Sequence, residues 1–560
     1  MPGPTSATDL NRTGLRGKFA DGLLAVLWGA LVFAANNLNV LRAQFQTPSG
    51  MRALWSPREI DIAQHLAWVN AMRDALVIPN YHMPARTTAG FFCLFTWLLG
   101  QVTKLGIDAA QAYAAAQLLV SILSVYCVLA CLRLFRIPGS RYFLVVLLAL
   151  ASVPPRALPN LWGALHGRGN SALFGFTDGF FIPGAFGVAL GTLSVFAALA
   201  LVTRYVLYGR RADLYATAAV AAFSGLCHPF EVFTIMAATS LTLLVTRWPS
   251  LRRAAAEALP VCVAGGLSLL PYAYLSLTVP WMSAMTRSNT EVLPDFLKLM
   301  LSLGLPAVFA LVMLVARPKL LAPTDVVLQC WFVAVLAVLH IPKLPYATHA
   351  ADGFSLIAAL LAVRQTGELR EVREWLLRHR RAAACGLAAM LAPALFAHAA
   401  YRYVIFHDAL NPNSRFGQSA VALPAEGDLI RWFRGHGSAE DVVIVPTTAT
   451  AWMLATAPVH TVASHWLFSG TFEAQQELRI RLYNGDWTPP QALEFLRRYG
   501  INYVVAPQGS RLQQLLGDHP RAAVFGPWTL YHLPENHMVD HLPDPEWSPF
   551  EPRSRTGAPL

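Results

Sequence analysis

Apolar runs of about 20 residues, the length that crosses a bilayer as a helix, recur along the first 403 residues of this chain. The connections between the runs are short, and arginine and lysine gather in every second one. Because basic connections stay on the cytoplasmic side, this alternation gives each run an orientation. The pattern predicts a polytopic α-helical membrane protein of about eleven helices, with residues 1–21 in the cytoplasm and the C-terminus outside.

The predicted spans begin with a run that resembles a signal anchor, since no convincing cleavage site follows it. Residues 42–112 then form the first outer loop, and the transmembrane domain extends over 22–403. The expected location is the cytoplasmic (inner) membrane. The spans are predicted at 22–41, 113–132, 142–157, 181–203, 214–227, 229–246, 258–279, 298–316, 324–342, 350–363 and 383–403.

One apolar patch, Ala89 to Gly100, is too short to be a span. It offers about 12 residues where a crossing helix needs about 20. If it crossed, the arginines Arg133, Arg136 and Arg141 would lie outside, against the positive-inside rule. We therefore expect a re-entrant or surface-lying helix here.

The pattern changes at about residue 404. The short β-branched and aromatic runs V-V-I-V-P, I-N-Y-V-V-A-P and W-T-L-Y-H-L alternate with the amphipathic runs A-L-E-F-L-R-R-Y and R-L-Q-Q-L-L. This alternation predicts a small extracytoplasmic α/β domain over 404–534. Residues 535–560, rich in proline and acidic residues, are expected to be a disordered tail.

Composition agrees with a membrane protein, because 55% of the 560 residues are hydrophobic and only 13% are charged. The net charge of +11 does not indicate a nucleic-acid partner, since the basic residues lie in the short connections. All seven cysteines fall in apolar segments, and their spacing fits no metal site. We expect no structural disulfide.

The predicted outer connections hold an unusual number of ionisable residues. Such groups are costly at a membrane boundary, so they are candidates for function. Structural alternatives stay open for each: acidic residues favour a helix N-terminus, a histidine can cap a turn, and an interfacial lysine can snorkel. The candidates are Glu59, Asp61, His65, His82, Arg86, Asp178, His228, Glu231, Lys343, Tyr346, His349 and Asp352.

Three segments, in this order, resemble motifs of the GT-C glycosyltransferases, and most closely the branch of the protein mannosyltransferases and aminoarabinose transferases. W-S-P-R-E-I-D-I-A at 55–63 resembles W-x-P-D-E-x-x-Y-A, with Glu59 at the acidic position and Arg58 in place of the usual aspartate. P-A-R-T-T-A-G-F-F-C at 84–93 resembles a K-P-P/I-x-x-Y-W segment without its lysine. K-L-P-Y at 343–346 resembles K-L-P-x-Y. The resemblance covers the architecture of about residues 20 to 365.

The resemblance implies an inverting transfer of a sugar from a polyprenyl-phosphate donor to an extracytoplasmic glycan, lipid or protein. Such a reaction needs a carboxylate base for the acceptor and cations for the leaving phosphate. Glu59 or Asp61 would be the base. The donor phosphate would be held by Lys343, with Arg86 and His349 as helpers. A divalent metal, Mg²⁺ or Mn²⁺, could bridge Asp61 to the phosphate.

Supporting roles around this site are expected for the remaining candidates: His65, His82, Asp178, His228, Glu231, Tyr346 and Asp352. Two other classes of protein fit the same sequence. A transporter or lipid flippase also buries ionisable groups in a membrane, although no internal repeat is apparent here. A non-catalytic partner in glycan assembly would explain why Arg58 departs from the motif.

Overall fold

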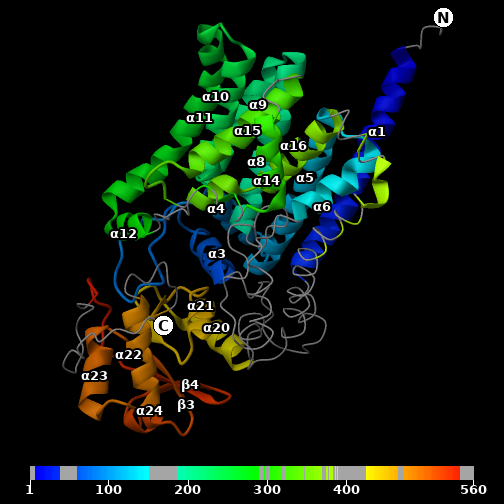
Figure 1. Cartoon of the computed structure of the whole chain (residues 1–560). Coiled ribbons are helices and arrows are strands. Elements are labelled where there is room, and N and C mark those ends of the chain that lie inside the picture. The colour runs from blue at the N-terminus through cyan, green and yellow to red at the C-terminus, as the bar shows by residue number, and fades with distance from the viewer. Residues whose placement is uncertain are drawn as a thin grey trace, which may run out of the picture.

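The computed structural model describes most of the transmembrane part and most of the outer domain. The described residues are 7–37, 60–150, 186–288, 303–316, 322–345, 347–368, 424–463 and 472–542, with single residues between 296 and 300 and between 374 and 392. Figure 1 shows a bundle of helices at one end and a smaller α/β unit at the other, with a segment of the first outer loop between them.

The helical part contains long apolar helices joined by short connections. Each predicted span from 22–41 to 350–363 overlaps a helix, whereas span 383–403 lies mostly outside the described residues. The elements are α1 (Ala7–Asn36), α3 (Ile60–Ala71), α4 (Leu94–Thr103), α5 (Ala109–Leu134), η1 (Gly139–Arg141), α6 (Tyr142–Leu150), α8 (Phe186–Tyr208), α9 (Arg211–Cys227), α10 (Glu231–Thr246), α11 (Leu251–Thr278), α12 (Pro280–Ser288), α14 (Leu305–Ala316), α15 (Pro323–Leu339), η3 (Ala347–Ala351) and α16 (Phe354–Glu368).

Three of these helices are long and apolar enough to cross a membrane, judged on the described residues alone. They are Ala109–Leu134, Ala189–Tyr208 and Leu251–Thr278. Shorter apolar helices, among them α10 and α15, accompany them. These helices are those of a multi-pass membrane protein, and the number of about eleven crossings stays a prediction.

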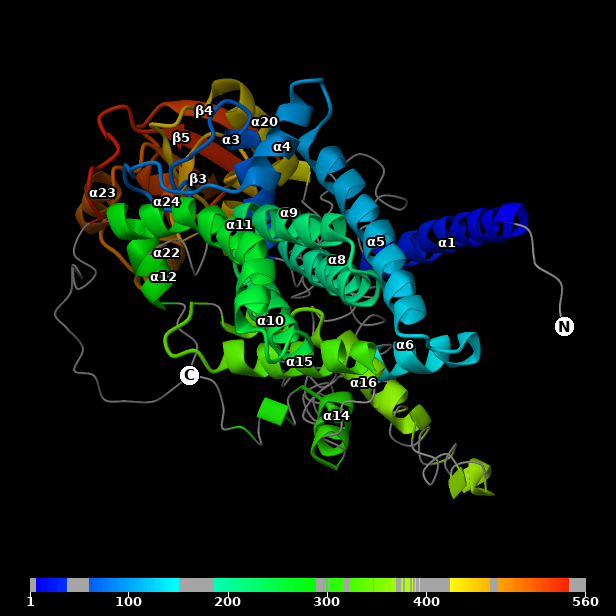
Figure 2. The same cartoon turned by 90° about the horizontal axis from the view of Figure 1, so that it is seen from above.

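The centre of the bundle is α15, which is buried along most of its length. It packs against α8, α10 and α16, as Figure 2 shows from above. Trp331 and Phe332 of α15 are fully buried in the same cluster as Phe196 of α8 and Phe354 of α16. Large side chains packed in this way fix the helix ends relative to one another, and the candidate site lies at those ends.

The apolar patch predicted not to cross the membrane forms α4, which has 10 residues. Ten helical residues extend about 15 Å, half of the hydrocarbon thickness of about 30 Å. The helix packs against α3, α5 and α9. Its length agrees with the expected short helix, and its position relative to the membrane stays a prediction.

The C-terminal part is an α/β domain with one five-stranded sheet of order β2-β1-β3-β5-β4. The first three strands in this order are parallel and the last two pair antiparallel. The expected alternation of strands and helices is therefore found. The elements are α20 (Pro424–His436), β1 (Val442–Ile444), α21 (Thr448–Leu454), β2 (His460–Thr461), α22 (Phe472–Asn484), α23 (Pro489–Arg498), β3 (Tyr503–Pro507), α24 (Arg511–Leu515), β4 (Arg521–Phe525) and β5 (Trp528–His532).

The α/β domain, named the outer domain after its predicted side of the membrane, shares a hydrophobic core with the predicted first outer loop. Leu66 and Val69 of α3 belong to the same buried cluster as Leu429 and Phe433 of α20. Backbone contacts add to this core, because the amide of Thr461 donates to the carbonyl of Tyr81 at 3.1 Å. The outer domain is thus placed directly on the loop that was expected to hold the catalytic carboxylates.

The first residues of the predicted disordered tail, 535–542, are described and have fixed partners. Asn536 is buried and donates from Nδ2 to the carbonyl of Ile501 at 2.8 Å. Val539 forms a parallel bridge with Ala85 of the first outer loop. Proline and acidic composition predicted disorder, but these backbone partners order the segment as far as residue 542. The remainder of the predicted tail lies outside the described residues.

Candidate functional site

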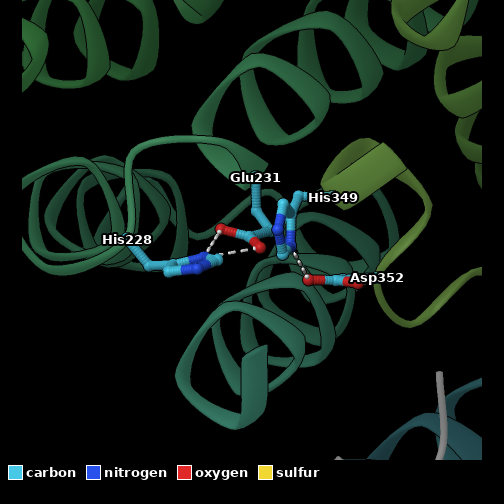
Figure 3. Close-up of side chains that lie close together, drawn as sticks. All are labelled: His228, Glu231, His349 and Asp352. Carbon is cyan, nitrogen blue, oxygen red and sulfur yellow. Dashed lines mark hydrogen bonds and ion pairs between the residues drawn. The ribbon is translucent and has the colours of Figure 1, made fainter. Parts of the chain in front are cut away.

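Four of the predicted site residues meet in one cluster, which Figure 3 shows in close-up. His228 lies in the break between α9 and α10, and Glu231 is the first residue of α10. His349 lies in η3, and Asp352 is the first residue after η3. One ligand atom from each residue can be chosen so that all four atoms lie within 4.8 Å of one another. Two segments that are more than a hundred residues apart in sequence thus form one polar site.

Each half of the cluster is a histidine followed three residues later by a carboxylate. Nδ1 of His228 lies 2.8 Å from both carboxylate oxygens of Glu231. Nδ1 of His349 lies 3.3 Å from Oδ2 of Asp352. A separation of three residues places two side chains on the same side of a helical turn, so each pair forms locally. Tertiary packing then brings the two pairs together.

The carboxylates are deeply buried: Glu231 is 0% exposed and Asp352 is 4% exposed. Space for Glu231 comes from Gly191 of α8, where a Cβ atom would lie 2.3 Å from the Glu231 carboxylate. The hydroxyl of Thr234 donates to the carbonyl of Ala350 at 3.1 Å, which ties α10 to η3. The cluster is therefore held on a rigid part of the bundle, as a preorganised site requires.

Phe230 holds the two imidazoles in place. Its ring stacks on His349 at a centroid distance of 5.1 Å and meets His228 edge-on at 5.0 Å. The two histidine rings contact each other in a T-shaped arrangement at 5.0 Å. Aromatic contacts of this kind restrict the rotation of the rings. The orientation of each imidazole ring is thus fixed by its contacts with Phe230 and with the other imidazole.

The second motif segment, 84–93, reaches this cluster. The thiol of Cys93, its last residue, lies 3.2 Å from the carbonyl oxygen of Cys227, the residue before His228. Trp281 donates from Nε1 to the carbonyl of Thr88 at 2.9 Å and fixes the middle of the segment. The 84–93 segment thus contacts the α9–α10 break, and the cluster joins that break to the 343–352 connection.

Lys343 stands on the same connection as His349. It is exposed, in the turn after α15, and has a φ of +60°, in the left-handed region that favours glycine. Tyr346, three residues later, lies outside the described residues.

The predicted catalytic carboxylates lie at the N-terminal end of α3. Glu59 is outside the described residues, and the backbone of Asp61 is helical although its side chain is not described. His65 on the next turn lies 2.8 Å, through Nδ1, from the hydroxyl of Tyr113 of α5. Asp178 also lies outside the described residues. The assignment of Glu59 and Asp61 as the base stays a prediction.

Arg86 and His82 lie where the first outer loop meets the outer domain. The guanidinium of Arg86 is exposed and pairs with Glu440 at 2.6 Å and with Asp540 at 3.7 Å. His82 is buried, and its backbone amide donates to Oδ1 of Asn80 at 3.0 Å. The structure thus places Arg86 against two carboxylates of the outer domain and does not bring it to the histidine cluster.

Sequence reasoning did not find Gly191 and Phe230, which shape the cluster, or Arg479 of the outer domain. The spacing in C-H-P-F-E and H-A-A-D indicates two local histidine–carboxylate pairs, and that signal was available. Nothing in the sequence indicates that the two pairs meet, or that a glycine on α8 makes room for one of them.

Two sequence comparisons return nothing: no family model matches the chain, and no curated protein matches it. Solved structures of similar shape exist. The chain is similar to ArnT from Cupriavidus metallidurans in the apo state, with 16% identity, a TM-score of 0.45, and coverage of 92% of this chain and 98% of that one.

Two further structures are similar at comparable identity. The archaeal oligosaccharyltransferase AglB from Archaeoglobus fulgidus, in complex with an inhibitory peptide and a dolichol-phosphate, has 12% identity, a TM-score of 0.39, and coverage of 92% and 75%. The arabinofuranosyltransferase AftD from Mycobacteria has 14% identity, a TM-score of 0.41, and coverage of 86% and 36%.

Proposed function

We propose that this chain is an integral membrane glycosyltransferase that transfers a sugar from a polyprenyl-phosphate donor to an extracytoplasmic acceptor. One observation carries the proposal. The motif segment 84–93 contacts the residue before His228, and the motif segment 343–346 leads into the turn η3, which carries His349, although more than two hundred residues separate the two segments in sequence. Motifs that meet in space form one site, whereas unrelated matches have no reason to do so.

The reaction assigns a role to each part of this site. An acceptor hydroxyl or amine attacks the anomeric carbon, its proton goes to a carboxylate, and the sugar leaves the lipid phosphate with inversion. Glu59 or Asp61 at the start of α3 is the proposed base. Lys343, whose ammonium is exposed on the turn after α15, is proposed to stabilise the charge that develops on the leaving phosphate.

We also propose that the four-residue cluster holds a divalent cation. Two imidazoles and two carboxylates are the donor set that zinc and manganese accept, whereas magnesium prefers oxygen ligands and several waters. The burial of Glu231 and Asp352 supports this assignment, because two adjoining buried carboxylates repel each other unless a positive charge lies between them. Mn²⁺ or Zn²⁺ therefore fits better than Mg²⁺. A bound cation would add positive charge beside the leaving phosphate.

The proposed placement follows from the charge pattern of the connections. The site faces the outside of the cytoplasmic membrane, where the C-terminal domain is also expected to lie. The proposed partners are a lipid-linked sugar, the bilayer and an acceptor glycan, lipid or protein.

Transfer by the purified full-length protein tests the function. The protein in detergent is incubated with a panel of polyprenyl-phosphate sugars and membrane extracts, and labelled product is measured. Asp61→Asn and Glu59→Gln should reduce transfer strongly, because each removes a carboxylate that can take the proton. The matched control is Asp74→Asn, an exposed carboxylate of the same loop. Retained transfer in the double variant of Glu59 and Asp61 would exclude both as the base.

Metal content tests the cation separately from activity. Elemental analysis of the purified protein should find about one bound transition metal per chain, lost in His228→Ala and His349→Ala. His340→Ala is the control, because His340 is exposed on the same connection and is hydrogen-bonded to the carbonyl of Leu336. Equal metal content in all four proteins would show that the cluster binds none.

A further inference from the structure

The outer domain contains a buried arginine whose charge the described chain does not neutralise. Arg479 of α22 is 4% exposed. Its Nη2 donates to the hydroxyl of Thr448 at 2.6 Å, whereas Nε and Nη1 are buried without a hydrogen-bond partner. Among the described residues, no carboxylate forms an ion pair with Arg479.

The position of Arg479 is fixed by its neighbours on α22. Gln475, one turn before it, accepts from the amide of Ala463 at 2.9 Å. Tyr483, one turn after it, brings its hydroxyl to 2.8 Å from the carbonyl of Val505 and 3.2 Å from that of Ile444. The three side chains follow at intervals of four and therefore share the face of α22 that lies on the sheet.

This face of α22 lies at the carboxyl ends of β1 and β3. Ile444 is the last residue of β1, and Thr448 begins α21 just beyond that strand. The core on the α22 side contains Val442, Ile444 and Val504, and the core on the α20 and α21 side contains Val443 and Val505. The helices that follow β1 and β2 therefore cover opposite faces of the sheet.

A parallel sheet of this topology has a preferred place for ligands. β1 lies between β2 and β3, so the connections leaving β1 and β2 run in opposite directions. Ligands of open α/β sheets bind outside the carboxyl ends of the strands at the point where the strand order reverses. Thr448, the hydrogen-bond partner of Arg479, follows β1 at this end of the sheet, and Tyr483 on the same face of α22 contacts both β1 and β3.

A buried guanidinium requires a partner. Arginine stays charged inside proteins, and a buried charge without a counter-charge costs several kcal/mol. Burial lowers the pKa of Arg479, but the guanidinium remains protonated at neutral pH. The Thr448 hydroxyl is neutral and satisfies one nitrogen only. Nε and Nη1 keep N–H donors that an oxygen of a carboxylate or phosphate group can accept.

We infer that Arg479 binds an oxyanion, a phosphate or carboxylate group of a ligand, at the carboxyl ends of β1 and β3 in the outer domain. The ligand supplies the negative charge that the described residues do not provide. Thr448 orients the guanidinium through its hydroxyl, and Tyr483 closes the site on the sheet side.

Thr448, the hydrogen-bond partner of Arg479, begins α21, the helix of the outer domain that contacts α3 of the first outer loop. α21 packs against α3, and Nδ2 of Asn70 at the end of α3 donates to the carbonyl of Thr456 at 2.9 Å. Figure 1 shows α21 directly below α3. On the proposed function, with its base at the start of α3, the oxyanion is a group of the acceptor, which makes the acceptor an acidic molecule.

Anion-dependent thermal stability of the full-length protein in detergent tests the site. Inorganic phosphate is compared with chloride at equal ionic strength for the parent, Arg479→Met and Arg481→Met. Arg481 is the matched control, because it lies on the same helix, paired with Glu477. Phosphate should raise the melting temperature of the parent and of Arg481→Met and leave that of Arg479→Met unchanged. An equal rise in all three proteins, or no rise in the parent, would overturn the inference.

The melting temperatures in chloride show whether Arg479 binds a ligand or stabilises the fold. Replacing an unpaired buried charge by an apolar side chain of similar length is neutral or stabilising. Arg479→Met in chloride should therefore melt no lower than the parent. A lower melting temperature together with an undiminished phosphate effect would mean that Arg479 holds the fold and binds no ligand.

Two further arms identify the source of the oxyanion. Succinate in place of phosphate reports a preference for carboxylate, and a short-chain phosphatidic acid added to the micelles reports a lipid phosphate. In the transfer assay, Arg479→Met should raise the KM for the acceptor and change kcat little. If the protein transfers no sugar but Arg479-dependent stabilisation is found, the proposed function is wrong and the oxyanion site stands.

Discussion

Nδ1 of His228 lies 2.8 Å from both carboxylate oxygens of Glu231, across the break that separates α9 from α10. Pro229 favours the break, because it cannot donate a helical hydrogen bond. Glu231 then begins a new helix, where a carboxylate is favoured by the dipole. The pair would form in this segment alone, and it becomes part of a larger site only where η3 brings in His349 and Asp352.

The first prediction concerns the space for Glu231. Gly191→Ala should displace the carboxylate, because the new Cβ would lie 2.3 Å from it. Overpacking of this kind costs about 1 to 3 kcal/mol of stability. The melting temperature and the metal content of Gly191→Ala should both be lower than those of the parent. Gly266→Ala is the control: nothing lies within 4 Å of its Cβ position, so helix propensity makes it neutral or stabilising. Equal behaviour of the two variants would show that Glu231 adjusts freely.

The second prediction concerns the donor phosphate. Lys343→Ala should lose about 2 to 4 kcal/mol of transition-state stabilisation, the cost of deleting one preorganised charge-stabilising group. Lys343→Arg should keep part of the activity, and Glu59→Gln should bind donor and not turn over. Lys104→Ala, at the end of α4, is the control. Donor binding and turnover are measured on purified variants. If Lys343→Ala matches the parent in both, Lys343 is an interfacial residue only.

The third prediction separates two roles of Arg86. Its ion pairs with Glu440 and Asp540 are exposed, so they contribute little to stability. Arg86→Ala should therefore leave the melting temperature nearly unchanged. If Arg86 assists the donor phosphate, the same variant lowers transfer. Glu440→Gln removes the partner and keeps the guanidinium, so its transfer rate is the comparison. If transfer falls equally in both variants, Arg86 acts through its contact with the outer domain and not on the donor phosphate.

The fourth prediction is a pH dependence at the joint between the outer domain and the first outer loop. Burial lowers the pKa of His460 below its ordinary value of 6.5, and Nδ1 of the ring lies 2.6 Å from the carbonyl oxygen of Met83. The folded state therefore favours the neutral ring. Its contribution to stability is complete above pH 6.5 and falls as the pH drops through the folded-state pKa, because the unfolded chain takes up the proton first.

The measurement is the melting temperature of the full-length protein as the pH is lowered from neutral. The parent should lose more stability than His460→Gln, which has no titrating group at this position. His436→Gln is the control, because His436 is exposed on α20 and should leave the parent's pH dependence intact. Identical pH profiles for the parent and His460→Gln would contradict the assignment.

The fifth prediction concerns the topology around α4. A cysteine at position 105 should react with a membrane-impermeant thiol reagent from the outside, because α4 is too short to cross. Leu105 is 79% exposed and suits this purpose better than Gly106, whose φ of +84° would strain a cysteine. A Cys385→Ala background removes an exposed native thiol. Labelling from the cytoplasmic side alone would reverse the predicted orientation.

The sequence by itself determined the elements of this protein. Run length predicted the helices that overlap the spans from 22–41 to 350–363, because a helix in a bilayer must satisfy its own backbone and requires an uninterrupted apolar run, but it did not predict α12. β-branched runs located β1, β3 and β5 of the outer domain in the same way. The spacing of three residues also determined the pairs His228–Glu231 and His349–Asp352, because such pairs form within a single turn.

Only the tertiary structure decided which pairs meet. The contact between the two histidine–carboxylate pairs depends on Gly191 and on the packing of α8, α10 and α15, which no local pattern records. The same holds for the burial of Arg479 with two nitrogens unpartnered and for the order of residues 536–542. Both depend on residues far away in sequence. Local structure depends on neighbouring residues, whereas burial and contacts between distant segments arise only when the whole chain packs.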